Sequence, residues 1–200
     1  WWKSTNYLYD KTEYLYYRDS RFFDKKEKNS SKVFWSRGNG WVIAGITRIL
    51  DNMPSNYPDR KGYEKIFKAM AKRIGALQQP DGTWHASLLD SESYPIKETS
   101  GTAFFTYALL WGINHGYLSY NEYFPVVKKA WAALNVCVEE NGKLGFVQAP
   151  GAAPETVSAD NSEVYGVGAY LLAGTELFKL VFEKEKADKK IIISNTLPIN

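Results

Sequence analysis

The sequence has very little cysteine and histidine, and this scarcity excludes several kinds of site. Cys137 is the single cysteine among 200 residues. The chain can therefore form no intrachain disulfide and no cysteine-based zinc site. His85 and His115 are the only two histidines, which argues against a histidine-rich metal centre. These counts argue against a cysteine- or histidine-based metal site. Our expectation for the chain is no metal and no other cofactor.

Two other features are missing, namely an excess of charge of one sign and a long apolar run. The 25 basic and 22 acidic residues give a net charge of +3, too balanced to indicate binding to nucleic acid. No stretch reads as long and apolar enough to span a membrane. Aromatic residues, in contrast, make up 16% of the chain, with 7 Trp, 14 Tyr and 10 Phe. Such content suits a large core, a carbohydrate cleft, or both.

The most informative segment is FWSRGNGW, residues 34–41, which places Arg37 between Trp35 and Trp41. A guanidinium offers a planar fork of donors suited to a carboxylate, and an indole offers a flat face suited to a sugar ring. Gly38 and Gly40 let a ligand approach the backbone closely. The segment predicts a glycine-rich turn that runs into a helix and holds a pocket for an acidic sugar. A helix start with buried aromatics is the alternative.

The apolar pattern predicts an all-α fold. Residues 40–53, 100–115 and 163–182 read as apolar helices rich in small residues, whereas residues 60–79 and 121–138 read as amphipathic helices. A helix that is apolar all round is buried, and an amphipathic one faces water. Inner helices that alternate with outer ones describe an α/α toroid. We therefore expect residues 1–200 to form one domain with inner helices near 40–53, 100–115 and 163–182.

The spacing of the inner helices predicts an incomplete ring. Similar segments recur at roughly 60–65 residues, a spacing typical of helical-hairpin repeats with long loops. A ring of six hairpins would need roughly 350–400 residues at that spacing, above the usual size of one domain. We therefore expect the C-terminal half of a larger protein. Its apolar flanks predict association with a missing N-terminal half or with another copy.

Three further polar residues are candidates for the site, and each has two interpretations. Asp19, beside Arg18, is either a local acid/base or an ion-paired loop carboxylate. Glu98 precedes an inner helix, where it binds ligand hydroxyls or anchors the backbone N–H groups of the helix start. His85, after Trp84, contacts substrate or makes a structural hydrogen bond.

Several motifs resemble those of glycoside hydrolase family 105, the unsaturated rhamnogalacturonyl hydrolases, and more distantly those of family 88, the unsaturated glucuronyl hydrolases. The matching segments follow the family's order and span most of the chain. They are LYYRDS (15–20), VFWSRGNGWV (33–42), QPDGTWH (79–85), ETSGTAFF (98–105) and YGVGAYLLA (165–173).

The resemblance implies an (α/α)6 barrel that removes a Δ4,5-unsaturated uronic acid from the non-reducing end of lyase-generated, pectin-type oligosaccharides. An Asp protonates the C4–C5 double bond, water adds at C5, and the resulting hemiketal opens without a metal. That Asp precedes the region aligned with Trp1, so the resemblance implies that the acid lies outside this chain. It also implies that Arg37 grips the uronate carboxylate between Trp35 and Trp41. Many members have a His where this chain has Arg18.

The sequence thus predicts a set of substrate-binding residues and leaves two other functions open. The set is Trp35, Arg37, Asn39, Trp41, Arg18, Trp84, His85 and Glu98, with Asp19 as the candidate acid within the chain. The expected partner is an acidic oligosaccharide, with neither nucleic acid nor membrane. One alternative is an inverting glycosidase on an α/α toroid that uses Asp19 and Glu98. The other is a non-catalytic sugar-binding half-domain.

Overall fold

The computed structural model describes the backbone of residues 1–196 and the side chains of residues 1–182, and this part of the chain is mostly helical. Its α-helices are α1 (Trp2–Leu8), α2 (Ser36–Asn52), α3 (Arg60–Ala76), α4 (Thr99–Asn114), α5 (Tyr120–Asn135) and α6 (Val164–Thr196). Two antiparallel strand pairs join β1 (Tyr9–Asp10) to β2 (Leu15–Tyr16) and β3 (Trp84–His85) to β4 (Lys97–Glu98). Short 3-10 helices occupy Ser20–Phe22 and Ser91–Ser93.

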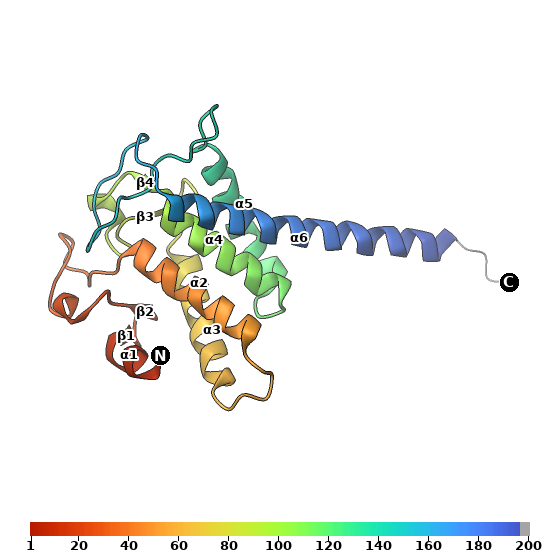
Figure 1. The fold of residues 1–200 in the computed structure, drawn as a ribbon, viewed down its shortest axis with the longest axis horizontal. Coiled ribbons are helices and arrows are strands. Elements are labelled where there is room, and N and C mark those ends of the chain that lie inside the picture. Colours follow the sequence, from red (N-terminus) through yellow and green to blue (C-terminus); the bar gives the residue numbers. More distant parts are fainter. Residues whose placement is uncertain (197–200) are drawn as a thin grey trace.

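The helices form two layers, as expected for part of an α/α toroid. Helices α2, α4 and α6 lie side by side and run in the same direction, so their N-terminal ends meet at one edge of the molecule (Figure 1). Helix α3 packs against α2, and α5 packs against α4. The prediction of inner helices alternating with outer ones is therefore confirmed. The loops that precede the inner helices gather at the shared edge.

The helix boundaries that differ most from those predicted are the start of α2 and the end of α6. Helix α2 begins at Ser36 rather than near residue 40, so Arg37, Gly38 and Asn39 lie in its first turn and not in a turn before it. Tertiary contacts override the low helix propensity of glycine here. A Cβ on Gly40 would lie 2.8 Å from Cβ of Phe104, so this glycine lets α2 pack closely on α4. Helix α6 continues beyond the predicted end at residue 182, to Thr196.

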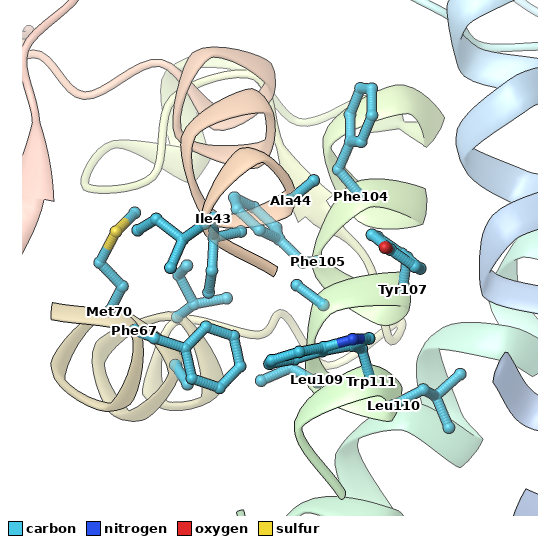
Figure 2. Packing of buried hydrophobic residues seen from close by; sticks show 14 of the residues in the cluster. Ile43, Ala44, Phe67, Met70, Phe104, Phe105, Tyr107, Leu109, Leu110 and Trp111 are labelled. Carbon is cyan, nitrogen blue, oxygen red and sulfur yellow. The ribbon is translucent and has the colours of Figure 1, made fainter. Parts of the chain in front are cut away.

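The core lies where α4 meets α2, α3 and α6. Figure 2 shows Phe67 of α3 facing Trp111 of α4, and their ring centroids are 5.3 Å apart in an edge-to-face arrangement. Ile43 and Phe105 are fully buried in the same cluster. Every residue of α4 from Thr99 to Ile113 is buried. This helix is the centre of the described fold.

Helix α6 is buried on one face and exposed on another. Ala169 and Ala173 are buried in the core cluster that α6 shares with α4. Leu171 and Phe178 are exposed, the latter by 67%. The segment Val164–Phe182 is long and apolar enough to cross a membrane by length and composition alone. The prediction that no segment meets this criterion is therefore wrong. The core helix of a soluble protein passes the same test, so the finding is weak evidence of a membrane.

Candidate functional site

Arg37 links the start of α2 to the loop before α6. Its side chain is buried, and the residue is 3% exposed. Nη1 donates to the carbonyl oxygen of Gln148 and to the hydroxyl of Tyr165, and Nη2 donates to the carbonyl oxygen of Ala149 at 2.9 Å. The guanidinium also lies over the rings of Trp35 and Tyr165, at 4.4 and 4.9 Å from their centroids. Arg37 therefore has a structural role that the sequence did not reveal.

These contacts use only part of the Arg37 guanidinium. An arginine side chain has five N–H donors. Three of them, two on Nη1 and one on Nη2, make the hydrogen bonds above. The other two, the Nε hydrogen and the second Nη2 hydrogen, have no partner within residues 1–182. A carboxylate could accept from the remaining donors, but Arg37 is 3% exposed and is not among the residues that line the pocket of Trp35. Binding of the uronate by Arg37 stays a prediction.

Trp35 lines a pocket between the start of α2 and the N-terminal segment. The pocket measures about 280 Å³, and Trp1, Tyr16, Arg18 and Gly38 are among its other lining residues. The Trp35 indole Nε1 donates to Oε1 of Gln148 at 2.9 Å. Gln148 itself does not line the pocket. An indole, a second indole and a guanidinium around one concavity suit an acidic sugar. The structure thus brings the predicted residues Trp35 and Arg18 together.

Trp41 lies apart from this pocket, one helical turn beyond Arg37. It is 52% exposed, and it is not among the residues that line the pocket of Trp35. Its ring packs on Phe104, with centroids 4.3 Å apart, and lies 6.3 Å from the ring of Tyr165. An exposed indole held on one side by the core offers its other side to a ligand. The two indoles of the motif therefore face different surroundings.

Asp19 is tied to two arginines. It accepts hydrogen bonds from Nη1 of Arg18, and from Nε and Nη2 of Arg21 at 3.0 and 2.9 Å. The hydrogen bonds from the Arg21 side chain are the main cause that holds the pKa of Asp19 well below its usual range. The carboxylate remains ionised at neutral pH, which makes Asp19 a poor proton donor. The interpretation of Asp19 as an ion-paired loop residue fits the structure better.

Glu98 is the N-cap of α4 and is completely buried. Its carboxylate accepts from the backbone N–H groups of Ser100 at 3.0 Å and Gly101 at 2.7 Å, and from that of Gln148 at 3.2 Å. A carboxylate at a helix N-terminus is stabilised by these donors and by the helix dipole. Of the two interpretations of Glu98, the anchoring one is what the structure shows. A role in an inverting pair with Asp19 is not supported, because the buried oxygens are already engaged.

Asn39 and Trp84 also hold backbone rather than face a cavity. Asn39 is buried, with Oδ1 accepting from the N–H of Tyr16 at 2.7 Å and Nδ2 donating to the carbonyl oxygens of Tyr16 and Trp35. Trp84 is fully buried and donates from Nε1 to the carbonyl oxygen of Ile74 at 2.8 Å. Neither side chain has a surface left for a sugar. Both assignments as direct substrate contacts are therefore corrected.

His85 lies at the edge of the β3–β4 pair and is partly buried. Its Nδ1 is 3.2 Å from the carbonyl oxygen of Ser91, and its Nε2 is 3.8 Å from a carboxylate oxygen of Asp81. These contacts are those of the structural interpretation. Within the described side chains, no group of three or more His, Cys, Asp or Glu could hold a metal ion.

Gln148 and Tyr165 are parts of the site that sequence reasoning missed. Gln148 is buried and contacts Trp35, Arg37 and Glu98, which come from two separate motifs. The available signal was weak, since Gln148 is a lone amide after the apolar residues 144–147. Tyr165 stands in the YGVGAY motif, which was matched but given no role in binding.

Comparison with known proteins finds relatives that are named as hydrolases. An unsaturated 3S-rhamnoglycuronyl hydrolase from Formosa agariphila is 52% identical over 181 residues, covering 88% of this chain and 48% of that protein. The unsaturated rhamnogalacturonyl hydrolase YesR from Bacillus subtilis is 30% identical over 142 residues, covering 71% of this chain and 38% of that protein. The chain spans about half the length, or less, of the curated relatives it matches.

A solved structure and a family profile lead to the same group. A glycosyl hydrolase family 88 protein from Bacteroides vulgatus superposes with a TM-score of 0.84 and 42% identity, covering 88% of this chain and 53% of that one. The profile described as Glycosyl Hydrolase Family 88 matches residues 2–181. The resemblance to the group of families 105 and 88 is confirmed. Because that profile covers most of its length, this chain belongs to glycosyl hydrolase family 88.

Proposed function

We propose that the protein carrying this chain releases a Δ4,5-unsaturated uronic acid from the non-reducing end of an oligosaccharide. The observation that carries the proposal is the pocket in which the Trp35 indole and the Arg18 guanidinium meet at the start of α2. An aromatic face binds the apolar side of the sugar ring, and the guanidinium attracts an acidic group. Family membership and the names of the relatives support the same class of reaction.

The proposed reaction is hydration of an enol ether. A carboxyl group protonates the C4–C5 double bond, and water adds at C5. The resulting hemiketal opens and frees the neighbouring sugar. The described carboxylates near the pocket do not suit the first step, because Asp19 is ion-paired to two arginines and Glu98 is buried under backbone donors. We propose that the acid comes from the part of the protein that corresponds to the remaining length of the relatives.

We propose rhamnose as the sugar that is released from the uronic acid. Both relatives named above have rhamnose in their names, one joined to a glycuronyl and one to a galacturonyl group. The pectin-type substrate expected from the sequence corresponds to the galacturonyl name. The unsaturated acid is the same in both cases, because the C4–C5 double bond removes the C4 stereocentre at which galacturonate and glucuronate differ. A disaccharide of this acid with rhamnose and one with a different neighbouring sugar therefore test the assignment of rhamnose.

The test is loss of enol-ether absorbance when the full-length protein is mixed with each disaccharide. We expect bleaching by the full-length protein. If the sugar binds but no bleaching occurs, the proposal fails and the non-catalytic sugar-binding alternative stands. The 200-residue chain alone is the second sample. Bleaching by it would place the acid within this chain and would contradict the assignment above.

Arg18 and Arg21 supply a matched pair of variants for the pocket. Both arginines bind Asp19, but Arg18 lines the pocket and Arg21 does not. Loss of a charged hydrogen bond costs about 1.5–3 kcal/mol, or roughly 10–100-fold in binding. We expect Arg18→Gln to raise KM by at least about tenfold and Arg21→Gln to leave it nearly unchanged. Equal effects would show that both act only through Asp19.

A further inference from the structure

Gln148 sits in a rigid part of the loop between α5 and α6. The residue is 1% exposed, and the preceding Val147 and Leu144 are buried against Cys137. Phe146 has a φ of 58°, a left-handed conformation that is uncommon for a bulky residue and that surrounding contacts must hold. Its carbonyl accepts from the N–H of Thr99 at 3.0 Å. The loop is therefore fixed to the start of α4 immediately before Gln148.

The backbone of Gln148 joins the starts of all three inner helices. Its N–H donates to the carboxylate of Glu98 at the start of α4, at 3.2 Å. Its carbonyl oxygen accepts from Arg37 at the start of α2 and from the hydroxyl of Tyr165 at the start of α6. These bonds set the position of the Gln148 Cα relative to the pocket, independently of what its side chain does.

The side chain of Gln148 contacts one of the residues that line the pocket, Trp35. Oε1 accepts the indole N–H of Trp35 at 2.9 Å, and Nε2 donates to the carbonyl oxygen of Ala153 at 2.8 Å. The bond to Ala153 orients the amide, because only Nε2 can donate to a carbonyl oxygen and Oε1 must then face the indole N–H. Gln148 is not among the residues that line the pocket, so its amide acts on a ligand only by way of the indole.

We propose that Gln148 is a positioning residue that holds the Trp35 indole in the orientation in which it binds the sugar. The expected effect on kcat/KM rests on the proposed function. The hydrogen bond that orients the indole does not. An indole fixed by a hydrogen bond and by the stacked guanidinium of Arg37 presents one ring face to the pocket. Without the amide oxygen, the indole N–H loses that acceptor, and the Arg37 guanidinium is left to hold the ring.

The experiment compares Gln148→Leu with Gln78→Leu in the full-length protein. Gln78 is the matched control, because its amide also makes partly buried structural hydrogen bonds, to the carbonyl oxygens of Gly82 and Val126, both at 2.9 Å. The first readout is the ¹⁵N–¹H resonance of the Trp35 indole, assigned by its absence in Trp35→Phe. We expect its shift to change and its exchange with water to accelerate in Gln148→Leu only. An unchanged resonance in Gln148→Leu would overturn the proposal.

The second readout is a double-mutant cycle in kcat/KM on the unsaturated disaccharide. Loss of one hydrogen bond is worth about 0.5–1.5 kcal/mol, so we expect Gln148→Leu to lower kcat/KM by roughly 3–10-fold. In the Trp35→Phe background the same change should have no further effect, because the indole through which it acts is gone. Additive losses would show that Gln148 acts independently of Trp35 and would overturn the proposal. Absence of turnover by the unmodified protein would instead refute the proposed function, and the indole resonance would still decide the positioning role.

Discussion

Helix α4 and the apolar part of α6, Val164–Phe182, have similar compositions and very different surroundings. Both are apolar and contain small residues, yet α4 is buried at every residue from Thr99 to Ile113, whereas α6 exposes Leu171 and Phe178. Helix α4 has α2 on one side, α6 on the other and α5 behind it, while α4 is the main helix that α6 packs against within the described residues. Apolar composition thus shows that a helix can be buried, and its neighbours determine how much of it is.

The largest expected difference is between two phenylalanines. Phe105 is fully buried in α4, and its ring lies edge-on to that of Trp84 at 5.3 Å. We expect Phe105→Ala to lower the free energy of unfolding of this chain by about 3–5 kcal/mol. Phe178→Ala in α6 should change it by no more than about 0.5 kcal/mol. Denaturant unfolding of the two variants measures both values, and equal costs would show that the face of α6 is covered in solution.

Two glycines sharpen the same comparison. A Cβ on Gly112 of α4 would lie 2.6 Å from Cδ1 of Leu118 and 2.9 Å from Cζ of Phe67, so Gly112→Ala should destabilise by about 1–3 kcal/mol. A Cβ on Gly168 of α6 would meet nothing within 4 Å. Gly168→Ala should therefore stabilise by about 0.5–1 kcal/mol through helix propensity. Thermal unfolding of both variants decides, and a loss of stability in Gly168→Ala would reveal a neighbour on that side.

Two tyrosines of α6 test how its first turn is held. The Tyr165 hydroxyl accepts from Arg37 at 2.7 Å and donates to the carbonyl oxygen of Gln148, whereas the exposed Tyr170 hydroxyl donates to the Asn135 side chain at 2.6 Å. Tyr165→Phe should cost about 1–2 kcal/mol, because it removes two hydrogen bonds and leaves one Nη1 hydrogen of Arg37 without its acceptor. Tyr170→Phe should cost less than about 0.5 kcal/mol. Similar values from urea unfolding would contradict the view that this end of α6 is fixed by the site.

The smallest expected effect concerns the partly buried carboxyl group of Glu27 rather than an apolar side chain. Burial raises the pKa of Glu27, and its hydrogen bond from Ser87 at 2.6 Å offsets this only in part. A carboxyl with a raised pKa stabilises the fold when protonated, and this stabilisation is lost as the pH rises through the folded-state pKa. Glu27→Gln should therefore raise the stability at pH 7 by about 0.5 kcal/mol after allowance for solvent screening. The gain should vanish below pH 4, and a gain independent of pH would rule out this cause.

The helix layers could be predicted from the sequence, because helical periodicity and the small residues of the inner helices are local signals. The start of α2 could not, since its glycine-rich first turn depends on the packing of Gly40 against Phe104. The capping role of Glu98 was one of the two predicted for it. It could be predicted because a helix cap involves only residues close together in the sequence. Gln148 could not be found, because nothing near it in the sequence indicates which helix starts it will contact.

The bonds of Gln148 also set the order in time in which the site can form during synthesis. Trp35 and its amide acceptor are 113 residues apart in the chain, and Arg37 and the Gln148 carbonyl are 111 apart. At ribosomal speeds this separation corresponds to a delay on the order of ten seconds. Throughout that interval α2 can be helical while its buried guanidinium and its indole still lack these partners. The nascent chain thus carries Trp35 and Arg37 well before it carries the residue that holds their side chains.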